Sequence, residues 1–165
     1  WLEDRIVEYY CQQNSYNKLH RTLIKPIYGD DYIGSGNELA DIAFIKDDDL
    51  YLVSTKVGFK TNDVLKCIDQ SMYSLEIMRN PEGFGVDDVI DYLHPKYVVL
   101  HFVLRKNLKK SNNNDPFVDK INKNEFKLSD LGSDFVRTKL IEWKNRVLEA
   151  KKVPKIFFDV IEIDE

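Results

Sequence analysis

The apolar run from Tyr97 to Leu104, interrupted only by His101, is the feature that most constrains the fold of this chain. The run is too short to cross a membrane and is typical of a central strand covered on both faces. Helical patterns lie on either side of it, at about 62–79 and 133–150, and a β-rich segment closes the chain at 156–163. This order predicts an α/β fold with a central mixed β-sheet flanked by α-helices.

The remaining pattern fits a single domain spanning residues 1–165. We expect a helix at 1–13, strand-prone residues at 23–28, a short helix at 86–93 and an Asn-rich loop near 111–116. No apolar run is long enough for a membrane span and no signal-peptide pattern opens the chain, so we expect a cytoplasmic location. Because the chain begins at Trp1 without an initiator Met, we expect a longer polypeptide whose other domains are partners.

A predicted hairpin brings a carboxylate and a lysine together. An apolar strand follows Asp41, a polar turn occupies 46–49, and a second strand of alternating residues runs to Lys56. Pairing of the two strands places Asp41 near Lys56. Alternation puts Ser54 and Lys56 on one face of the strand and Thr55 on the other. A carboxylate beside a lysine can hold a divalent metal ion and stabilise a phosphate during hydrolysis.

Further oxygen ligands lie within reach of this pair. Glu38 precedes Asp41 by three residues, and the backbone carbonyl of Thr55 is another candidate. The first helix offers Glu3 and Glu8, which could reach across to the hairpin. Oxygen ligands of this kind suit Mg²⁺ or Mn²⁺. The expected metal ligands are Asp41, Glu38, Glu8 and Thr55, with Glu3 as a further carboxylate.

These residues resemble a known pattern. A helix with Glu, then Asp41, then the Ser54-x-Lys56 strand end, and then a helix bearing Gln70 is similar to the PD-(D/E)XK, or restriction endonuclease-like, superfamily. Some RecB-type members carry a glutamine on this helix, although here Tyr73 comes one residue earlier than their Gln-x-x-x-Tyr spacing. The segment 38–79 looks most like a sporadically distributed family of defence and mobile-element proteins. The resemblance implies a restriction endonuclease-like nuclease with catalytic residues Asp41, Lys56, Gln70 and Ser54.

Ser54 departs from the superfamily pattern, which has a metal-binding acid at this position. Two functions therefore stay open. One is a Mg²⁺- or Mn²⁺-dependent nuclease acting on nucleic acid, DNA in preference to RNA, in defence against foreign nucleic acid. The other is a catalytically degenerate module that binds nucleic acid or a protein partner. A structural domain of a larger assembly, and a homodimer, are also compatible with the sequence.

Composition excludes some other sites. The net charge of -4 argues against a protein that coats nucleic acid through bulk charge. Cys11 and Cys67 have no second ligand at zinc spacing, and the three histidines occur at unrelated spacings. The sequence therefore predicts neither a zinc site nor a histidine-based centre, and it predicts His101 to be a hydrogen-bonded core residue.

Overall fold

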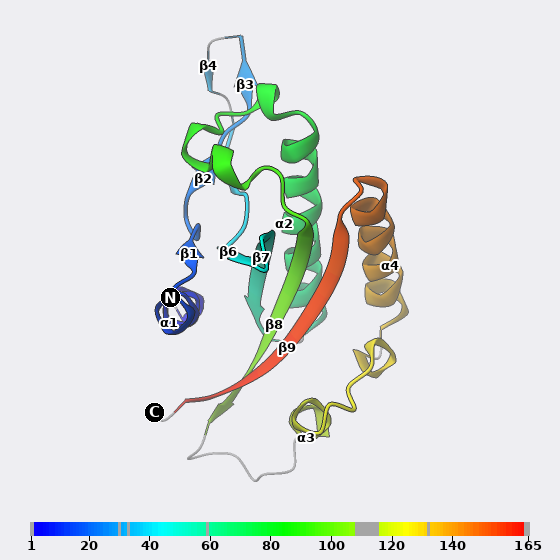
Figure 1. Ribbon diagram of the computed structural model, residues 1–165. Coiled ribbons are helices and arrows are strands. Elements are labelled where there is room, and N and C mark those ends of the chain that lie inside the picture. Colours follow the sequence, from blue (N-terminus) through cyan, green and yellow to red (C-terminus); the bar gives the residue numbers. More distant parts are fainter. Residues whose placement is uncertain are drawn as a thin grey trace.

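A mixed sheet with helices on both faces forms the core of the fold, seen here in a computed structural model (Figure 1). The structure describes residues 2–29, 31–32, 34–58, 60–107, 116–131 and 133–163. Within them the main sheet has five strands in the order β1-β6-β7-β8-β9. The predicted mixed α/β sheet is confirmed. Most of the expected Asn-rich loop lies outside the described residues.

The bounds of the elements are as follows. The helices are α1 (Leu2–Asn14), α2 (Thr61–Arg79), α3 (Pro116–Asn122) and α4 (Asp134–Glu149), with 3₁₀ helices at Pro81–Gly83, Asp87–Tyr92 and Leu128–Leu131. The main sheet contains β1 (Asn17–Lys18), β6 (Ile42–Lys46), β7 (Asp49–Val57), β8 (Tyr97–Asn107) and β9 (Val153–Ile163). Shorter strands are β2 (Leu23–Ile24), β3 (Ile27–Tyr28), β4 (Asp31–Tyr32) and β5 (Asn37–Glu38). The helix expected at 86–93 is therefore a 3₁₀ helix, and α3 was not expected.

The predicted hairpin is formed by β6 and β7, which pair antiparallel from Lys46↔Asp49 to Ile42↔Val53. Its turn places Asp47 and Asp48 at φ values of 53° and 65°, in the left-handed region. Asp tolerates this region better than most residues, which explains why a polar Asp run makes this turn. β7 then pairs in parallel with β8, and β8 with β9. The apolar run at 97–104 is thus central, as predicted.

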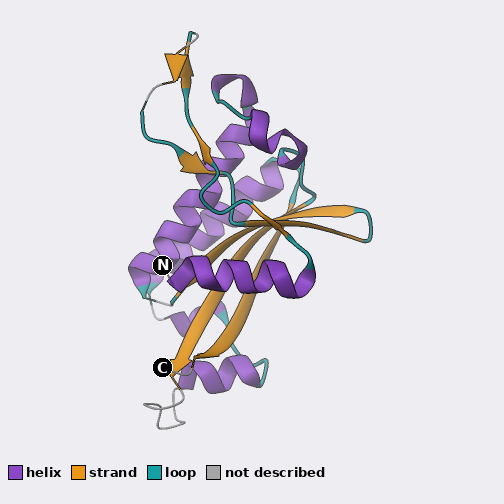
Figure 2. Cartoon of the chain, turned by 90° about the vertical axis from the view of Figure 1, so that its left-hand side faces the viewer, coloured by secondary structure: helices purple, strands orange, loops and turns teal. Residues whose placement is uncertain are grey.

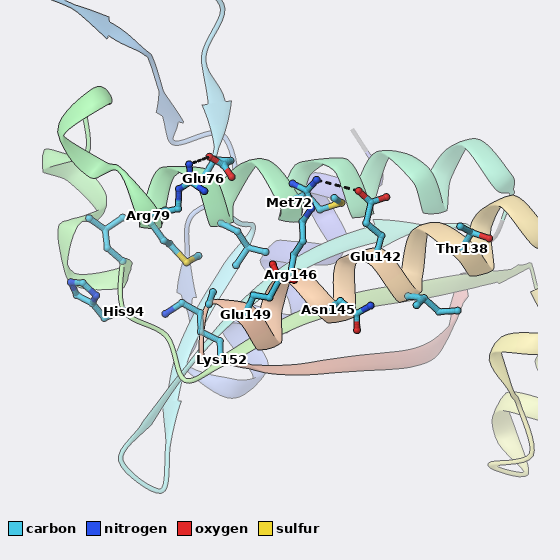
Figure 3. A pocket seen from close by; sticks show the side chains of 15 residues that line it. Met72, Glu76, Arg79, His94, Thr138, Glu142, Asn145, Arg146, Glu149 and Lys152 are labelled. Atoms are coloured by element: carbon cyan, nitrogen blue, oxygen red, sulfur yellow. Dashed lines mark hydrogen bonds and ion pairs between the residues drawn. The ribbon is translucent and has the colours of Figure 1, made fainter.

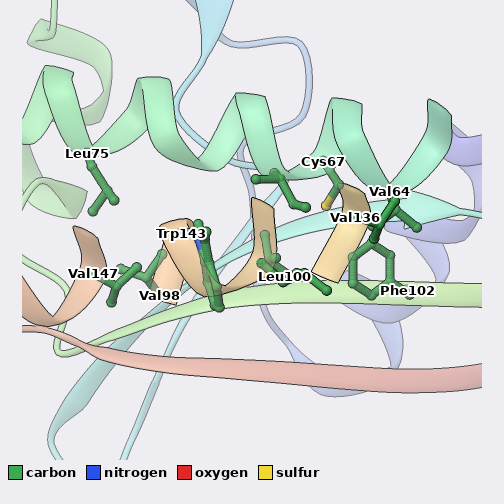
Figure 4. Close-up of a cluster of buried hydrophobic side chains, with 11 residues drawn as sticks. Val64, Cys67, Leu75, Val98, Leu100, Phe102, Val136, Trp143 and Val147 are labelled. Carbon is green, nitrogen blue, oxygen red and sulfur yellow. The ribbon is translucent and has the colours of Figure 1, made fainter. Parts of the chain in front are cut away.

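Both faces of β8 are covered, which explains its nearly continuous apolar sequence. Val98, Leu100 and Phe102 face α2 and α4, where they join the largest buried cluster (Figure 4). Val99 faces α1, which crosses the opposite face of the sheet (Figure 2). Trp143 of α4 is only 1% exposed, and its indole N–H donates to Ser71 Oγ at 2.9 Å. No described helix is long and apolar enough to span a membrane.

An arm, residues 21–38, extends away from the main sheet (Figures 1 and 2). It consists of two small antiparallel pairs, β2 with β5 and β3 with β4. The arm contacts the segment after α2, where the Gly85 N–H donates to the Lys25 carbonyl at 3.0 Å. Its first residue follows His20, its last residue is Glu38, and His20 Nδ1 lies 3.5 Å from Glu38 Oε2. The fold therefore brings these two residues together at the base of the arm, beside Asp41.

Candidate metal centre

Asp41 lies where β6 separates from β7. The last paired residues are Ile42 and Val53, and beyond them the Thr55 N–H has no β6 carbonyl to pair with. The Asp41 carboxylate takes that place, because its Oδ2 accepts the Thr55 N–H at 2.7 Å. Asp41 is only 1% exposed. A buried carboxylate held by the backbone at the fork of two strands is fixed in position, as a ligand needs to be.

His20 binds the other oxygen of Asp41. The distance from His20 Nδ1 to Asp41 Oδ1 is 2.6 Å, and His20 Nε2 lies 2.8 Å from Asp4 Oδ1 of α1. The backbone supports this contact, since the Leu19 and His20 N–H groups both donate to the Asp41 carbonyl, at 2.9 and 3.1 Å. The hydrogen bond to Asp41 raises the pKa of His20, against the opposing effect of burial.

Glu38 brings a second carboxylate to the same place. Its Oε2 lies 3.5 Å from His20 Nδ1, and its Oε1 accepts the Arg21 N–H at 2.9 Å. Burial raises the pKa of Glu38, and the negative charge of Asp41 raises it further. A carboxylate whose ionisation is opposed by burial and by a neighbouring negative charge is stabilised in its ionised form by a nearby cation. This electrostatic arrangement is the kind that a divalent metal ion stabilises.

Helix α1 contributes Glu3 to the same group of ligand atoms. Glu3, His20 and Asp41 each offer a ligand atom, and these atoms all lie within 4.8 Å of one another. Two carboxylates and an imidazole suit Mn²⁺ well, and the carboxylates suit Mg²⁺. The donor set therefore fits a divalent cation.

Lys56 borders the same group. Its Nζ lies 3.1 Å from Glu3 Oε2, and its side chain is 26% exposed. Burial alone would lower the pKa of Lys56, but the hydrogen bond and charge of Glu3 outweigh it and the pKa is raised. The ammonium group therefore stays charged beside the carboxylates, where it can contact an anionic substrate.

The other predicted site residues are placed differently. Ser54 is buried, and its carbonyl accepts the Cys67 thiol at 3.5 Å, so it lies against α2. Gln70 is on α2, and within the described residues its Nε2 is buried with no hydrogen-bond partner. The Thr55 carbonyl leaves the strand on the same side as its N–H, toward Asp41. Glu8 is exposed and outside the group, because five residues turn a helical side chain about 140° away from Glu3.

Sequence reasoning missed His20 and Asp4. His20 stands 21 residues before Asp41, in a stretch without clear periodicity. The pairing of the two-residue strand β1 with β6, with Lys18 opposite Ile42, brings it to the site, and the backbone bonds of Leu19 and His20 to the Asp41 carbonyl continue that pairing. The sequence offered one signal for His20, which is that it directly precedes the irregular segment 21–38 that ends at Glu38. The expectation that no histidine joins a metal centre is not supported by this arrangement.

A separate groove of about 1040 Å³ lies between α2 and α4 (Figure 3). It shares no residue with the Asp41 group. Glu76 lies 3.7 Å from Arg79, and Glu142 lies 3.2 Å from Arg146, so charges on its rim neutralise one another. The groove therefore offers no concentration of one charge, and the Asp41 group is the better candidate site.

Comparisons with family models, with curated proteins and with solved structures found no match for this chain.

Proposed function

We propose that this domain is a Mg²⁺- or Mn²⁺-dependent nuclease that hydrolyses phosphodiester bonds of nucleic acid. The observation that carries the proposal is the convergence of Glu3, His20 and Asp41 within 4.8 Å, with the Lys56 ammonium 3.1 Å from Glu3. A cluster of carboxylates, with Asp41 buried and Glu3 half-buried, beside a charged lysine matches the needs of metal-assisted phosphodiester cleavage.

The order of the elements supports a restriction endonuclease-like fold. A helix is followed by the β6–β7 hairpin, a second helix, and the strand β8, which lies parallel to β7. Asp41 and Lys56 lie on the two strands of the hairpin, at the end where β6 and β7 separate. This is the arrangement that the resemblance to the PD-(D/E)XK superfamily implies. Defence against foreign nucleic acid, with DNA preferred to RNA, is part of the same proposal.

Each residue then has a chemical task. Glu3, His20 and Asp41 would hold the metal ion, with Glu38 and the Thr55 carbonyl beside them. A bound divalent ion lowers the pKa of coordinated water and neutralises charge on the phosphate. Lys56 would stabilise the negative charge that develops on the scissile phosphate.

Two residues of the family pattern, Gln70 and Ser54, need a separate account. The buried Gln70 Nε2 has hydrogen-bond donors to offer to a phosphate oxygen or to a water molecule. Ser54 supplies no acid, but His20 and Glu3 bring the ligand count at Asp41 to three. A neutral Ser54 therefore does not by itself leave the centre without ligands.

A cleavage assay tests the proposal. Single- and double-stranded DNA and RNA are incubated with the purified chain in Mn²⁺, beside the variants Lys56→Ala and Asp41→Asn and an EDTA control. Lys46→Ala is the matched control, because Lys46 is an exposed lysine at the far end of the same hairpin. We expect cleavage by the wild type and Lys46→Ala, and loss of cleavage in the other three samples.

A catalytically degenerate module is the second candidate, and Ser54 is the observation that favours it. The serine is buried against α2, and no acid occupies the position where the superfamily has one. Such a module would bind nucleic acid or a protein partner without a metal ion. A folded wild type that cleaves no substrate, and whose binding of nucleic acid survives both EDTA and Lys56→Ala, would make this the better assignment.

A further inference from the structure

A second chain of polar contacts lies beneath α1 and joins three strands of the sheet. Thr55 Oγ1 on β7 lies 3.2 Å from His101 Nδ1 on β8. His101 Nε2 lies 2.7 Å from Asp159 Oδ2 on β9. The Tyr10 hydroxyl of α1 donates to the same Asp159 oxygen at 3.1 Å. The prediction that His101 is a hydrogen-bonded core residue is confirmed.

The proton positions in this chain follow from the partners. The hydrogen bond from His101 lowers the pKa of Asp159, so its carboxylate is ionised and accepts from both neighbours. His101 therefore carries its proton on Nε2. The Thr55 hydroxyl lies within hydrogen-bonding distance of the other ring nitrogen, Nδ1, so both ring nitrogens of His101 have partners.

Thr55 connects this chain to the metal centre. Its N–H holds Asp41 Oδ2 at 2.7 Å, while its hydroxyl is held by His101 on the neighbouring strand. The β6 side of Thr55 has no strand partner, because β6 has already separated from β7. The contact with His101 therefore adds a side-chain anchor to Thr55 at the point where β7 has lost β6 and is paired with β8 alone.

The same chain also fixes α1. Tyr10 contacts Asp159 by its hydroxyl, and its ring meets the His101 ring edge-on with centroids 4.9 Å apart. Glu3 lies seven residues before Tyr10, which is about two helical turns, so both side chains lie on the sheet-facing side of α1. Holding Tyr10 therefore helps to hold the helix that carries Glu3.

We propose that His101 is a positioning residue of the metal centre, which fixes Asp41 through Thr55 and Glu3 through Asp159 and Tyr10. This inference rests on the proposed function, since it assumes that the centre binds a divalent cation. It goes beyond that function because His101 touches none of the expected ligand side chains. Groups that orient metal ligands from outside typically change metal affinity by about 10- to 100-fold when they are removed.

The test is Mn²⁺ affinity, measured from the electron paramagnetic resonance signal of free Mn²⁺ and independent of cleavage. Thr55→Val keeps the branched shape and the backbone but removes the hydroxyl. His101→Gln keeps a donor near Asp159 and removes the contact to Thr55, whereas His101→Asn keeps a polar atom near the Nδ1 position. Tyr9→Phe is the matched control, because Tyr9 is adjacent to Tyr10 but 53% exposed.

We expect Thr55→Val and His101→Gln to weaken Mn²⁺ binding by about 10- to 100-fold. His101→Asn should retain more affinity than His101→Gln, and Tyr9→Phe should match the wild type. Unchanged affinity in Thr55→Val and His101→Gln would overturn this inference alone and leave a purely structural role for the chain. If the wild type bound no Mn²⁺, the proposed function would fall and this inference with it.

Discussion

Gln70→Met should make the metal-free protein more stable while it impairs cleavage. The Gln70 Nε2 is buried, and no acceptor for it lies among the described residues. A buried donor without a partner costs about 1–3 kcal/mol. Methionine has a similar length and helix propensity but no such donor. The substitution should therefore increase the free energy of unfolding by about 1–3 kcal/mol.

Urea denaturation in EDTA measures this change directly, and thermal unfolding gives a second reading. For a domain of this size, each kcal/mol raises the melting temperature by about 2–4 °C. Gln13→Met is the control, because Gln13 is an exposed glutamine on α1 and its substitution should change stability by less than about 0.5 kcal/mol. Loss of cleavage together with higher stability would indicate an amide kept for function.

A Gln70→Met protein that is less stable than the wild type, or equally stable, would refute this reasoning. Such a result would mean that the Gln70 amide is already satisfied in the folded protein. The amide would then have a structural role.

Three further predictions concern the centre and the core. Mn²⁺ at about 100 times its dissociation constant should stabilise the wild type by about 2.7 kcal/mol, or about 5–11 °C in melting temperature, and Asp41→Asn should abolish the shift in calorimetry. Mn²⁺ affinity should rise with pH from about 4.5 to above 6.5, the ordinary pKa values of Glu and His, because Glu38 and His20 have raised pKa values and must release their protons to solvent when the metal ion binds. Titration calorimetry at several pH values measures this dependence. Equal affinity at pH 5 and pH 8 would contradict that linkage. Trp143→Phe should lower the free energy of unfolding by about 1–3 kcal/mol in urea denaturation, since it removes the indole donor to the buried Ser71 hydroxyl.

Strong periodic signals made the central part of the fold predictable. The apolar run at 97–104 indicated a strand covered on both faces, and β8 has α2 and α4 on one side and α1 on the other. The hairpin was equally clear, because its turn consists of residues that tolerate left-handed backbone. The arm was not predictable as such, since strands of two residues leave no measurable alternation.

The candidate site likewise contains residues that local patterns predicted and residues that they did not. Asp41 and Lys56 belong to one hairpin, so local pairing was enough to bring them to the same fork. Glu3 was a candidate because its helix was clear, although the choice between Glu3 and Glu8 required the rotation of α1 on the sheet. His20 was missed because its contact with Asp41 depends on β1, a strand too short to predict from pattern. A single sequence carries no clear signal for long-range pairing between irregular segments.

The most direct measurement of the central claim is anomalous X-ray diffraction from crystals of the wild type soaked in Mn²⁺. We expect one anomalous peak enclosed by the Glu3, His20 and Asp41 side chains, and its loss in crystals of Asp41→Asn. An empty centre in well-ordered crystals at a Mn²⁺ concentration that supports cleavage, or a peak held by other residues, would contradict the assignment of these three side chains as metal ligands.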